Sequence, residues 1–273
     1  MSHTSLLIIV PTLNSHELLP RLVSSLQAQT MRDWRLLFID GPSDVKHREW
    51  LQLSCAAEPR CSWVEQEPDR QGIFGAMSQG FAAARHEDWL LFWGSDDWAS
   101  STHALADLLQ VQSGDGCAPD LVVCAGRYVS SDGQPTRASS FFSTSRAFDS
   151  KPLLWTDLSS RRYRRFLFLG ATPPHQATLF GPGAIQKINS YRPGLRLAAD
   201  LDYFLRLAVF SPLCIRVANL QLVHMTEGGV SAQQTRRRLE EVRLSYQRAF
   251  GCFWVLPFLL RYLRRAWTRL RFQ

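Results

Sequence analysis

The sequence contains no run of apolar residues long enough to cross a membrane as a helix. Cys252 to Leu260 is apolar over nine residues but includes Pro257, and a spanning helix needs about 20 residues. The apolar stretch Leu6 to Val10 follows no basic residue and is too short for the core of a secretory signal. We therefore expect neither a transmembrane segment nor a signal peptide.

Cysteine pairs of the C-x-x-C type are also absent, which argues against a zinc finger or a thioredoxin-like redox site. The six cysteines are scattered, and several lie in apolar surroundings, such as Cys124 after Leu121, Val122 and Val123. We expect reduced, mostly buried thiols, as in a cytosolic protein.

Glycine-rich phosphate loops are missing after the first predicted strand. The chain continues there as Pro11-Thr12-Leu13-Asn14-Ser15, without G-x-G-x-x-G. This argues against a dinucleotide-binding Rossmann domain. The Gly-rich, Arg-containing loop of a sugar-nucleotide pyrophosphorylase is missing from the same place, which argues against that enzyme class.

Positive charge is concentrated at the C-terminal end. The net charge is +7, and residues 232–273 carry ten arginines but only two glutamates. Leu263, Trp267 and Leu270 lie among these arginines, a composition typical of a helix on a membrane surface. The alternative is a helix that packs on the core with a solvated arginine face. Nucleic-acid binding is disfavoured because no recognised module accompanies the arginines.

Short apolar runs alternate with helical periodicity over the first half of the chain. This pattern predicts an α/β fold with a mostly parallel sheet flanked by helices. Residues 130–160 show no firm elements and are expected to form a long surface segment, with a hairpin as the alternative. A further helix is expected over Asp200 to Phe210. The predicted strands are Leu6–Val10, Arg35–Ile39, Trp63–Gln66, Leu90–Trp93, Leu121–Ala125, Leu213–Val217 and Leu220–His224.

Two adjacent carboxylates, Asp96 and Asp97, follow the fourth strand at its C-terminal end. That edge of an open α/β sheet is where ligands bind. Neighbouring carboxylates repel each other, and a hard divalent cation relieves the repulsion. Both residues also suit a helix N-terminus, which is the alternative interpretation.

Seven collinear motifs together resemble the inverting family 2 glycosyltransferases of the GT-A fold, and among these the bacterial branch that builds capsule, exopolysaccharide and lipopolysaccharide O-chains. The resemblance covers about residues 5–232. It implies a GT-A domain over residues 1–231, followed by a basic amphipathic helical tail over 232–273. The matching segments are Ile9–Asn14, Ile39–Gly41, Glu67–Met77, Phe92–Asp97, His175–Phe180, Ala199–Leu207 and Gly228–Ser231.

The resemblance implies a donor-binding side. Pro11, Thr12 and Asn14 lie where the family contacts the nucleotide. Asp40 lies where a carboxylate reads the base, although an aspartate at a turn is also common there. Asp69 matches the second acidic residue on the nucleotide side.

The resemblance also implies the catalytic groups. Asp96 and Asp97 match the metal site, in which Asp97 binds Mg²⁺ or Mn²⁺ and Asp96 faces the substrate. Asp200 matches the catalytic base, with a helix N-cap as its alternative role and Asp202 as the alternative base. His175 is expected at the mouth of the site, near acceptor or diphosphate, with a structural histidine as the alternative.

The sequence departs from the family pattern on the donor side. The family usually has D-x-G-I-Y-D-A-M-N, whereas here one residue is inserted between Asp69 and Gly72. Gly75 replaces the usual Asp, and Ser78 replaces the usual Asn. The turn after Asp40 is also shorter than usual. These changes bear on the identity of the sugar nucleotide more than on the reaction.

These residues predict a metal-dependent inverting hexosyltransferase that uses a nucleotide diphosphate-sugar, with UDP favoured over GDP and dTDP. The predicted acceptor is a lipid-linked glycan of surface polysaccharide synthesis, including lipopolysaccharide. Arg161 to Arg165 would meet its phosphate or form a solvated charge run. We expect a cytoplasmic protein held peripherally on the inner face of the membrane by its tail. The alternative is a catalytically silent assembly subunit, which the presence of Asp96, Asp97 and Asp200 disfavours.

Overall fold

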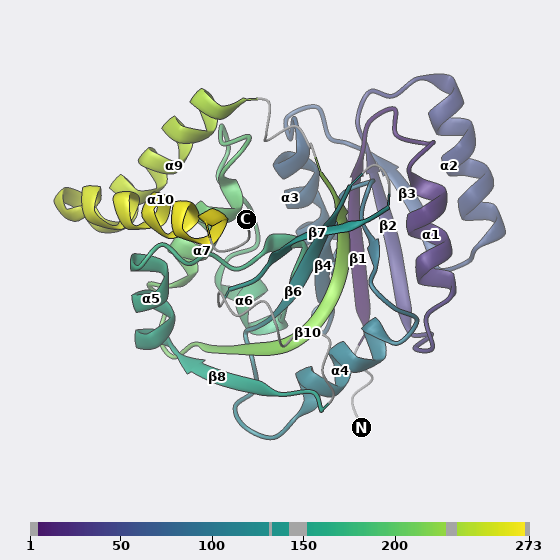
Figure 1. Cartoon of the computed structure of the whole chain (residues 1–273). Coiled ribbons are helices and arrows are strands. Elements are labelled where there is room, and N and C mark those ends of the chain that lie inside the picture. The colour runs from purple at the N-terminus through teal and green to yellow at the C-terminus, as the bar shows by residue number, and fades with distance from the viewer. Residues whose placement is uncertain (1–4, 131–132, 142–151, 228–233, 271–273) are drawn as a thin grey trace.

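The computed structural model describes residues 5–130, 133–141, 152–227 and 234–270. These residues form one ten-stranded sheet covered by helices on both faces (Figure 1). The main strand order is β3-β2-β1-β4-β9-β6-β10-β5, with β7 paired to β6 and β8 paired to β10. The strands are β1 Leu6–Thr12, β2 Trp34–Asp40, β3 Cys61–Glu65, β4 Trp89–Phe92, β5 Trp98–Ala99, β6 Leu121–Val129, β7 Pro135–Ser139, β8 Trp155–Ser159, β9 Thr178–Phe180 and β10 Cys214–Thr226.

The first four strands are parallel, as the sequence predicts. β1 lies between β2 and β4, with Leu6 opposite Trp34 on one side and Trp89 on the other. Beyond β4 the sheet is mixed, because β9 inserts antiparallel between β4 and β6. The long strands β6 and β10 pair parallel with each other, and β5, β7, β8 and β9 pair antiparallel with their neighbours. The predicted α/β fold is confirmed, with a mixed sheet whose long strands are mostly parallel.

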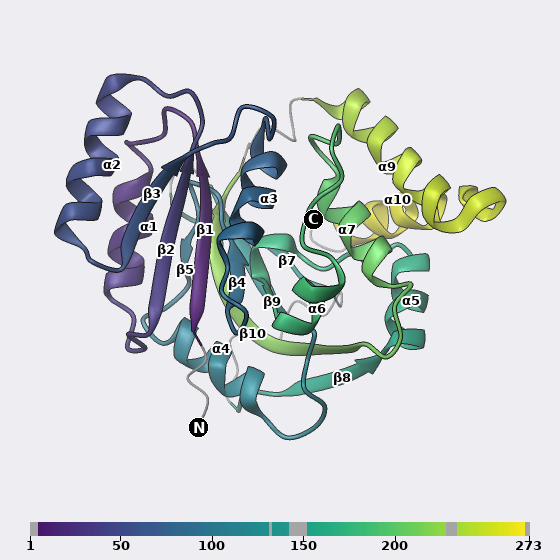
Figure 2. The same ribbon diagram turned by 180° about the vertical axis from the view of Figure 1, so that it is seen from behind.

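Helices cover the two faces of the sheet in separate sets. α1, α2 and α4 pack on one face, and α3, α6 and α7 pack on the other. The C-terminal helices α9 and α10 lie at the opposite end of the molecule from α1 and α2 (Figure 2). The helices are α1 Leu19–Gln27, α2 Val45–Ala57, α3 Ile73–Ala83, α4 Ala104–Ser113, α5 Ser160–Phe168, α6 Pro182–Lys187, α7 Ala199–Leu207, α9 Thr235–Phe250 and α10 Val255–Leu270, with short 3₁₀ turns η1 His175–Ala177 and η2 Gly251–Phe253.

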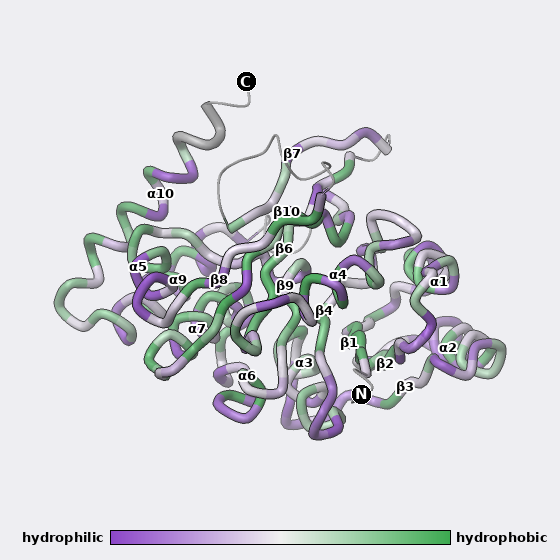
Figure 3. The backbone as a smooth tube through the Cα atoms, turned by 90° about the horizontal axis from the view of Figure 1, so that it is seen from below, coloured by the Kyte–Doolittle hydropathy of each residue, from purple (hydrophilic) through white to green (hydrophobic). Residues whose placement is uncertain are grey.

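β1 shows why this sequence forms a sheet buried on both sides. Leu6, Ile8 and Val10 point into the cluster beneath α1, while Leu7 and Ile9 point into the cluster beneath α3. Because side chains alternate along a strand, an unbroken apolar run is needed where helices cover both faces. The central strands β1, β4 and β6 are accordingly hydrophobic along most of their length (Figure 3).

The second half of the chain differs from the sequence-based prediction. The two strands expected over residues 213–224 form one long strand, β10, with register shifts between Val217 and Val223 along β6. The segment expected to lack firm elements contributes β7 and β8, both of which pair antiparallel with neighbours. The turn expected over 227–231 falls mostly outside the described residues.

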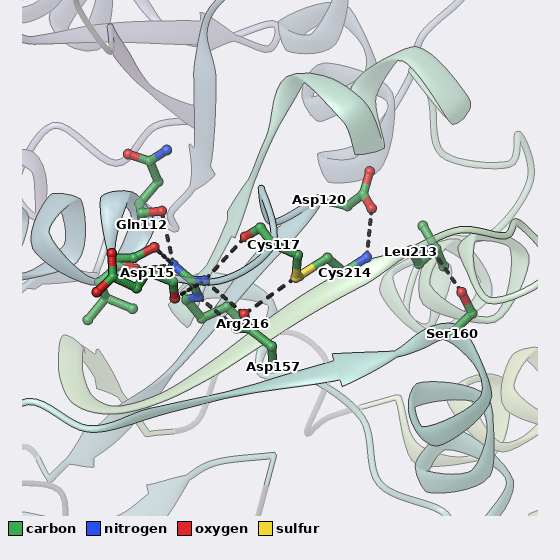
Figure 4. The surroundings of a disulfide bond; sticks show 11 residues. Gln112, Asp115, Cys117, Asp120, Asp157, Ser160, Leu213, Cys214 and Arg216 are labelled. Carbon is green, nitrogen blue, oxygen red and sulfur yellow. Dashed lines mark hydrogen bonds and ion pairs between the residues drawn. A yellow bond between two sulfur atoms is a disulfide. The ribbon is translucent and has the colours of Figure 1, made fainter.

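The expectation that all thiols are reduced is wrong for one pair. Cys117 and Cys214 form a disulfide, with their Cα atoms 6.3 Å apart (Figure 4). The two cysteines are 97 residues apart in the chain, so no local spacing signalled the pair. Beside them, the buried Arg216 pairs with Asp157 at 2.7 Å. Cys55, Cys61, Cys124 and Cys252 are free.

The C-terminal helices pack on the core through one of their faces. α9 contacts α7, and α10 contacts α5. Trp254, Phe258 and Tyr262 lie against the core cluster, and the buried Arg261 donates a hydrogen bond to Thr172 Oγ1. The alternative interpretation of the tail, a core-packing helix, therefore holds for this face.

Candidate active site

The acidic pair Asp96 and Asp97 lies in the turn between β4 and β5, at the C-terminal edge of the parallel strands. The N–H of Trp93 donates to the carbonyl of Ile9 at 3.1 Å, which extends β4 beside β1. The N–H of Gly94 then donates to the Asp97 carboxylate at 2.6 Å, and the N–H of Asp97 returns to the Gly94 carbonyl at 3.2 Å. This turn fixes Asp97 at the sheet edge. The alternative of a helix N-terminus does not hold here.

The Asp97 carboxyl group is buried, and Asp96 is partly buried. Asp97 is only 3% exposed. Burial raises its pKa well above the ordinary range, the Asp96 charge raises it further, and the Gly94 N–H only partly offsets this. Burial also raises the pKa of Asp96. A divalent cation relieves the repulsion between two neighbouring carboxylates. Mg²⁺ is usually held by one or two carboxylates plus substrate phosphates. The two side chains fit such an ion.

One cluster of three possible metal ligands lies elsewhere in the described residues, namely Cys117, Asp157 and Cys214. Its two sulfur atoms are joined to each other. Its carboxylate receives Arg216 hydrogen bonds of 2.7 and 2.8 Å. Protein contacts therefore occupy this cluster, and the acidic pair is the better cation site.

The loop after β1 is bound to the loop after β2 by residues predicted to contact the nucleotide. Thr12 Oγ1 donates to Asp40 Oδ1 at 3.0 Å. Asn14 adopts a left-handed conformation (φ 49°), which asparagine tolerates better than most residues. Its N–H donates to Ser43 Oγ at 3.0 Å, and its Oδ1 accepts from the Asp44 N–H at 2.8 Å.

Pro11 connects the same loop to the acidic turn. Ser95 Oγ donates to the Pro11 carbonyl at 3.1 Å, and Ser15 Oγ donates to Ser95 Oγ at 3.0 Å. The loops that follow β1, β2 and β4 are therefore one hydrogen-bonded unit at a single sheet edge. The structure brings together Pro11, Thr12, Asn14, Asp40, Asp96 and Asp97, as the sequence predicts.

Asp40 is enclosed by protein groups. Ser43 Oγ donates to its Oδ1 at 2.6 Å, and His47 Nε2 lies 3.1 Å from the same oxygen. Arg48 Nε lies 3.4 Å from Oδ2. These contacts hold Asp40 next to Thr12, on the side predicted to bind the nucleotide. Its role in reading the base stays a prediction.

Asp200 is the second residue of α7 and is partly exposed. The N-cap position belongs to Ala198, so Asp200 is not the cap. Within the described ranges, no hydrogen bond or ion pair engages its carboxylate. Asp202, the alternative base, is 2% exposed and paired with Arg192 at 3.2 Å and Arg206 at 2.9 Å. These contacts favour Asp200 as the proton acceptor.

His175 lies in the core and not at an open mouth. It is 8% exposed and its Nε2 lies 2.6 Å from the hydroxyl oxygen of Tyr191. The rings of Phe74 and Phe92 surround it, with centroids at 6.2 and 5.5 Å. Burial lowers the pKa of His175 to about 4, against a smaller opposing effect of the Asp200 charge. His175 is therefore a neutral imidazole with a structural role, close to the predicted base Asp200. A contact between His175 and the substrate stays a prediction.

Most of the sequence matches a known protein family. The model of the family "Glycosyl transferase family 2" matches residues 7–178. The chain belongs to glycosyltransferase family 2. This glycosyltransferase is 28% identical over 225 residues to a PGL/p-HBAD biosynthesis glycosyltransferase of Mycobacterium tuberculosis, covering 82% of this chain and 78% of the relative. An uncharacterized glycosyltransferase of the same species is 31% identical over 77% of this chain and 71% of its own length.

Solved structures show the same fold at low sequence identity. The crystal structure of S. aureus TarS residues 1–349 has a TM-score of 0.66 and 15% identity, and the match covers 96% of this glycosyltransferase and 72% of TarS 1–349. The mannosyltransferase PcManGT of Pyrobaculum calidifontis, in complex with GDP-Man and Mn²⁺, has a TM-score of 0.62 and 14% identity, with 98% and 72% covered. The GT-A type fold predicted from the motifs is confirmed.

Two departures from the family pattern, the inserted residue before Gly72 and the glycine at position 75, are linked in the structure. Asp69 is exposed in the turn between β3 and α3, where the chain carries one extra residue before Gly72. The carbonyl of Arg70 lies so close to α3 that a Cβ atom at Gly75 would overlap it. The longer turn therefore requires glycine at position 75, where the family usually has Asp.

Sequence reasoning missed Tyr128 of β6 and Arg265 of α10. Burial raises the pKa of Tyr128, and the charges of Asp97 and Asp200 raise it further while Arg265 lowers it. Burial and nearby arginines lower the pKa of Arg265 to about 10, and Asp200 opposes this effect. The charges of Asp97, the predicted metal ligand, and of Asp200, the predicted base, therefore both raise the pKa of Tyr128. A tyrosine at the C-terminal end of a central strand was the available signal.

We expect Asp202→Asn to lower stability and to spare catalysis. Its carboxylate binds Arg192 and Arg206, and losing hydrogen bonds to a charged group costs about 2 kcal/mol. Thermal unfolding should shift down by several degrees, while kcat per folded molecule changes less than about 3-fold. A kcat loss as large as that of Asp200→Asn would transfer the base assignment to Asp202.

Proposed function

We propose that this glycosyltransferase moves a hexose from a nucleotide diphosphate-sugar to an acceptor hydroxyl, with metal dependence and inversion at the anomeric carbon. One observation carries the proposal. The acidic pair follows β4, and the unengaged Asp200 carboxylate lies at the start of α7. The buried His175 packs against both elements, with ring centroids 5.5 Å from Phe92 of β4 and 6.5 Å from Phe204 of α7. One base and one cation suffice for a single displacement.

The proposed reaction uses Asp200 as general base. Its carboxylate accepts the proton of the acceptor hydroxyl as that oxygen attacks the anomeric carbon. The bond between this carbon and the diphosphate oxygen breaks on the opposite face, and the nucleoside diphosphate leaves. Asp97 and Asp96 would hold Mg²⁺ or Mn²⁺, which supplies positive charge for the leaving diphosphate. The Mn²⁺ in the PcManGT complex supports this assignment.

We propose a UDP-sugar as donor. TarS 1–349 in complex with UDP-GlcNAc has a TM-score of 0.65 to this chain. Pro11, Thr12, Asn14 and Asp40 form the nucleotide side in this proposal, with Asp69 on the neighbouring turn. The GDP-Man complex of PcManGT makes GDP-sugars the main competitor.

The test is release of nucleoside diphosphate from a panel of UDP-, GDP- and dTDP-sugars, with Mn²⁺ or with EDTA. Release from one donor that needs the metal would identify the donor and support the proposed class. Absence of metal-dependent binding and release with every donor would contradict it and favour the silent assembly subunit.

We further propose a lipid-linked glycan acceptor of surface polysaccharide synthesis, lipopolysaccharide included, reached at the cytoplasmic face of the membrane. The support is the outer face of η2 and α10, where Phe253, Leu256, Leu259 and Leu263 are exposed. Arg161, Arg162, Arg164 and Arg165 are exposed on the adjacent α5. Apolar side chains beside arginines suit an anionic lipid surface. No helix in the described ranges is both long and apolar enough to span a bilayer.

Replacing Leu256, Leu259 and Leu263 together by serine should weaken binding to anionic vesicles at least about 10-fold, because each loses apolar burial in the lipid. Thermal stability should not fall, since all three are exposed. Sedimentation with phosphatidylglycerol vesicles measures the binding. Leu53→Ser on α2, also exposed, is the matched control and should bind normally. Equal binding by the triple variant and the control would refute membrane attachment through α10.

A further inference from the structure

Glu241, in the middle of α9, reaches across to the segment that leads into α7. Its side chain is buried, and the residue is 5% exposed. Its carboxylate accepts hydrogen bonds from three successive backbone N–H groups: Arg196 at 3.0 Å, Leu197 at 2.7 Å and Ala198 at 3.0 Å. Arg237 Nε, one turn earlier on α9, lies 3.2 Å from the other oxygen.

This arrangement anchors the segment that leads into α7. Successive N–H groups form a concave anion site, and the N-terminus of a helix carries partial positive charge. The N-cap residue of α7 is Ala198, whose side chain cannot accept a hydrogen bond. The Glu241 carboxylate binds the N-cap N–H of α7 and the two N–H groups before it, although Glu241 lies more than 40 positions later in the chain.

The geometry bears directly on Asp200, which follows Ala198 by two residues. No hydrogen bond within the described ranges orients the Asp200 carboxylate, so the backbone at the start of α7 determines where it lies. Base catalysis depends on that position, since a displacement of about 1 Å can cost about 10²-fold in rate.

We propose that Glu241 is a positioning residue for the catalytic base, and that α9 belongs to the catalytic unit and not to a separable tail. The inference rests on the proposed role of Asp200. The packing of α9 agrees with it: Val242 and Tyr246 are buried in the core cluster that contains Leu201 and Phe204 of α7. Ser245 Oγ donates to the Glu241 carbonyl at 2.9 Å.

The test compares Glu241→Ala and Glu241→Gln with wild type in the full chain. We expect Glu241→Ala to lower kcat about 10²-fold and to leave the KM for the donor within about 2-fold. Glu241→Gln keeps one oxygen for the N–H groups and should recover part of the rate. Glu240→Gln is the matched control, because Glu240 is exposed on the same helix and lies 3.7 Å from Arg236. It should behave as wild type.

A double variant separates positioning from general damage. If Glu241 acts through Asp200, Glu241→Ala should not lower the residual rate of Asp200→Asn any further. A further drop, or a parallel loss of donor affinity, would overturn the positioning role. Should Glu241→Ala fail to fold, Glu241→Gln gives the same comparison, and a wild-type kcat in that folded variant together with unchanged hydrogen exchange over 196–204 would overturn it.

The outcome also distinguishes this inference from the proposed function. If Asp200→Asn retains full turnover, the base assignment fails whatever Glu241 does. If Asp200→Asn loses turnover but keeps donor binding, while both Glu241 variants turn over as wild type, only the positioning role fails.

Discussion

Asp97→Asn should reduce sugar transfer about 10³-fold. In the wild type, the Gly94 N–H donates to the Asp97 carboxylate at 2.6 Å. The amide oxygen of the variant can still accept this hydrogen bond, so the turn should keep its conformation. What is lost is the negative charge for a cation. The measurement is transfer rate against Mn²⁺ concentration, and a variant that retains wild-type Mn²⁺ dependence would remove Asp97 from the metal site.

The same substitution should stabilise the metal-free protein at neutral pH. The pKa of Asp97 is raised in the folded state by burial and by the Asp96 charge. Between its unfolded pKa of about 4 and this raised value, the folded state binds more protons, so stability falls as pH rises. The Asp97→Asn variant does not lose stability in this way as the pH rises, because its amide does not titrate.

Thermal unfolding at several pH values checks this expectation. In EDTA the variant should melt above wild type at pH 7, and the difference should shrink as the pH approaches about 4. Added Mn²⁺ should raise the melting temperature of wild type but not of the variant, because a ligand stabilises only the state that binds it. Equal Mn²⁺ shifts for both proteins would contradict the site.

Asp200→Asn should bind the donor normally and fail to transfer the sugar. General base catalysis contributes about 10²- to 10⁴-fold, and an amide cannot take the acceptor proton. We expect kcat to fall about 10³-fold, while the donor Kd with Mn²⁺ stays within about 2-fold of wild type. Isothermal titration with the donor and a single-turnover assay with acceptor measure the two quantities. Loss of donor binding in proportion to kcat would indicate a structural role.

Asp202→Asn is the natural control for this experiment, since it lies on the same helix. Its carboxylate is already committed to Arg192 and Arg206. The pair of variants therefore separates a free acid from a paired one at two positions in one turn.

The N-terminal half of the fold could be predicted because its signals are local. Apolar runs such as Leu6 to Val10 and the turn at Gly94 are visible in the sequence, and parallel strands place their C-terminal ends together. This logic brought Thr12, Asp40 and Asp97 to one edge. The resemblance already favoured Asp200 over Asp202, and the structure adds that Asp202 is paired with Arg192, which lies outside the motif.

The second half was harder because its pairing is non-local. The break expected between Val217 and Leu220 does not occur. β10 continues through this segment, and its pairing with β6 shifts register there. Charges in the tail were visible, but their contacts were not. Glu241 looked like one of two acids in a basic tail, yet it lies buried against the start of α7. The metal and base assignments, and the boundary at residue 231, stay predictions.

The position of β9 has a consequence for how the chain folds and how it can be shortened. Phe180 pairs with Leu90 of β4 and with Leu121 of β6, so β9 joins two strands that are both made earlier. During synthesis, β4 and β6 each keep an unpaired edge until residue 180 has been added to the chain. Unpaired strand edges promote aggregation. The match to the family ends at residue 178, the first residue of β9. A fragment cut to that match would lack both β9 and β10, would leave β4 and β6 with unpaired edges, and should aggregate.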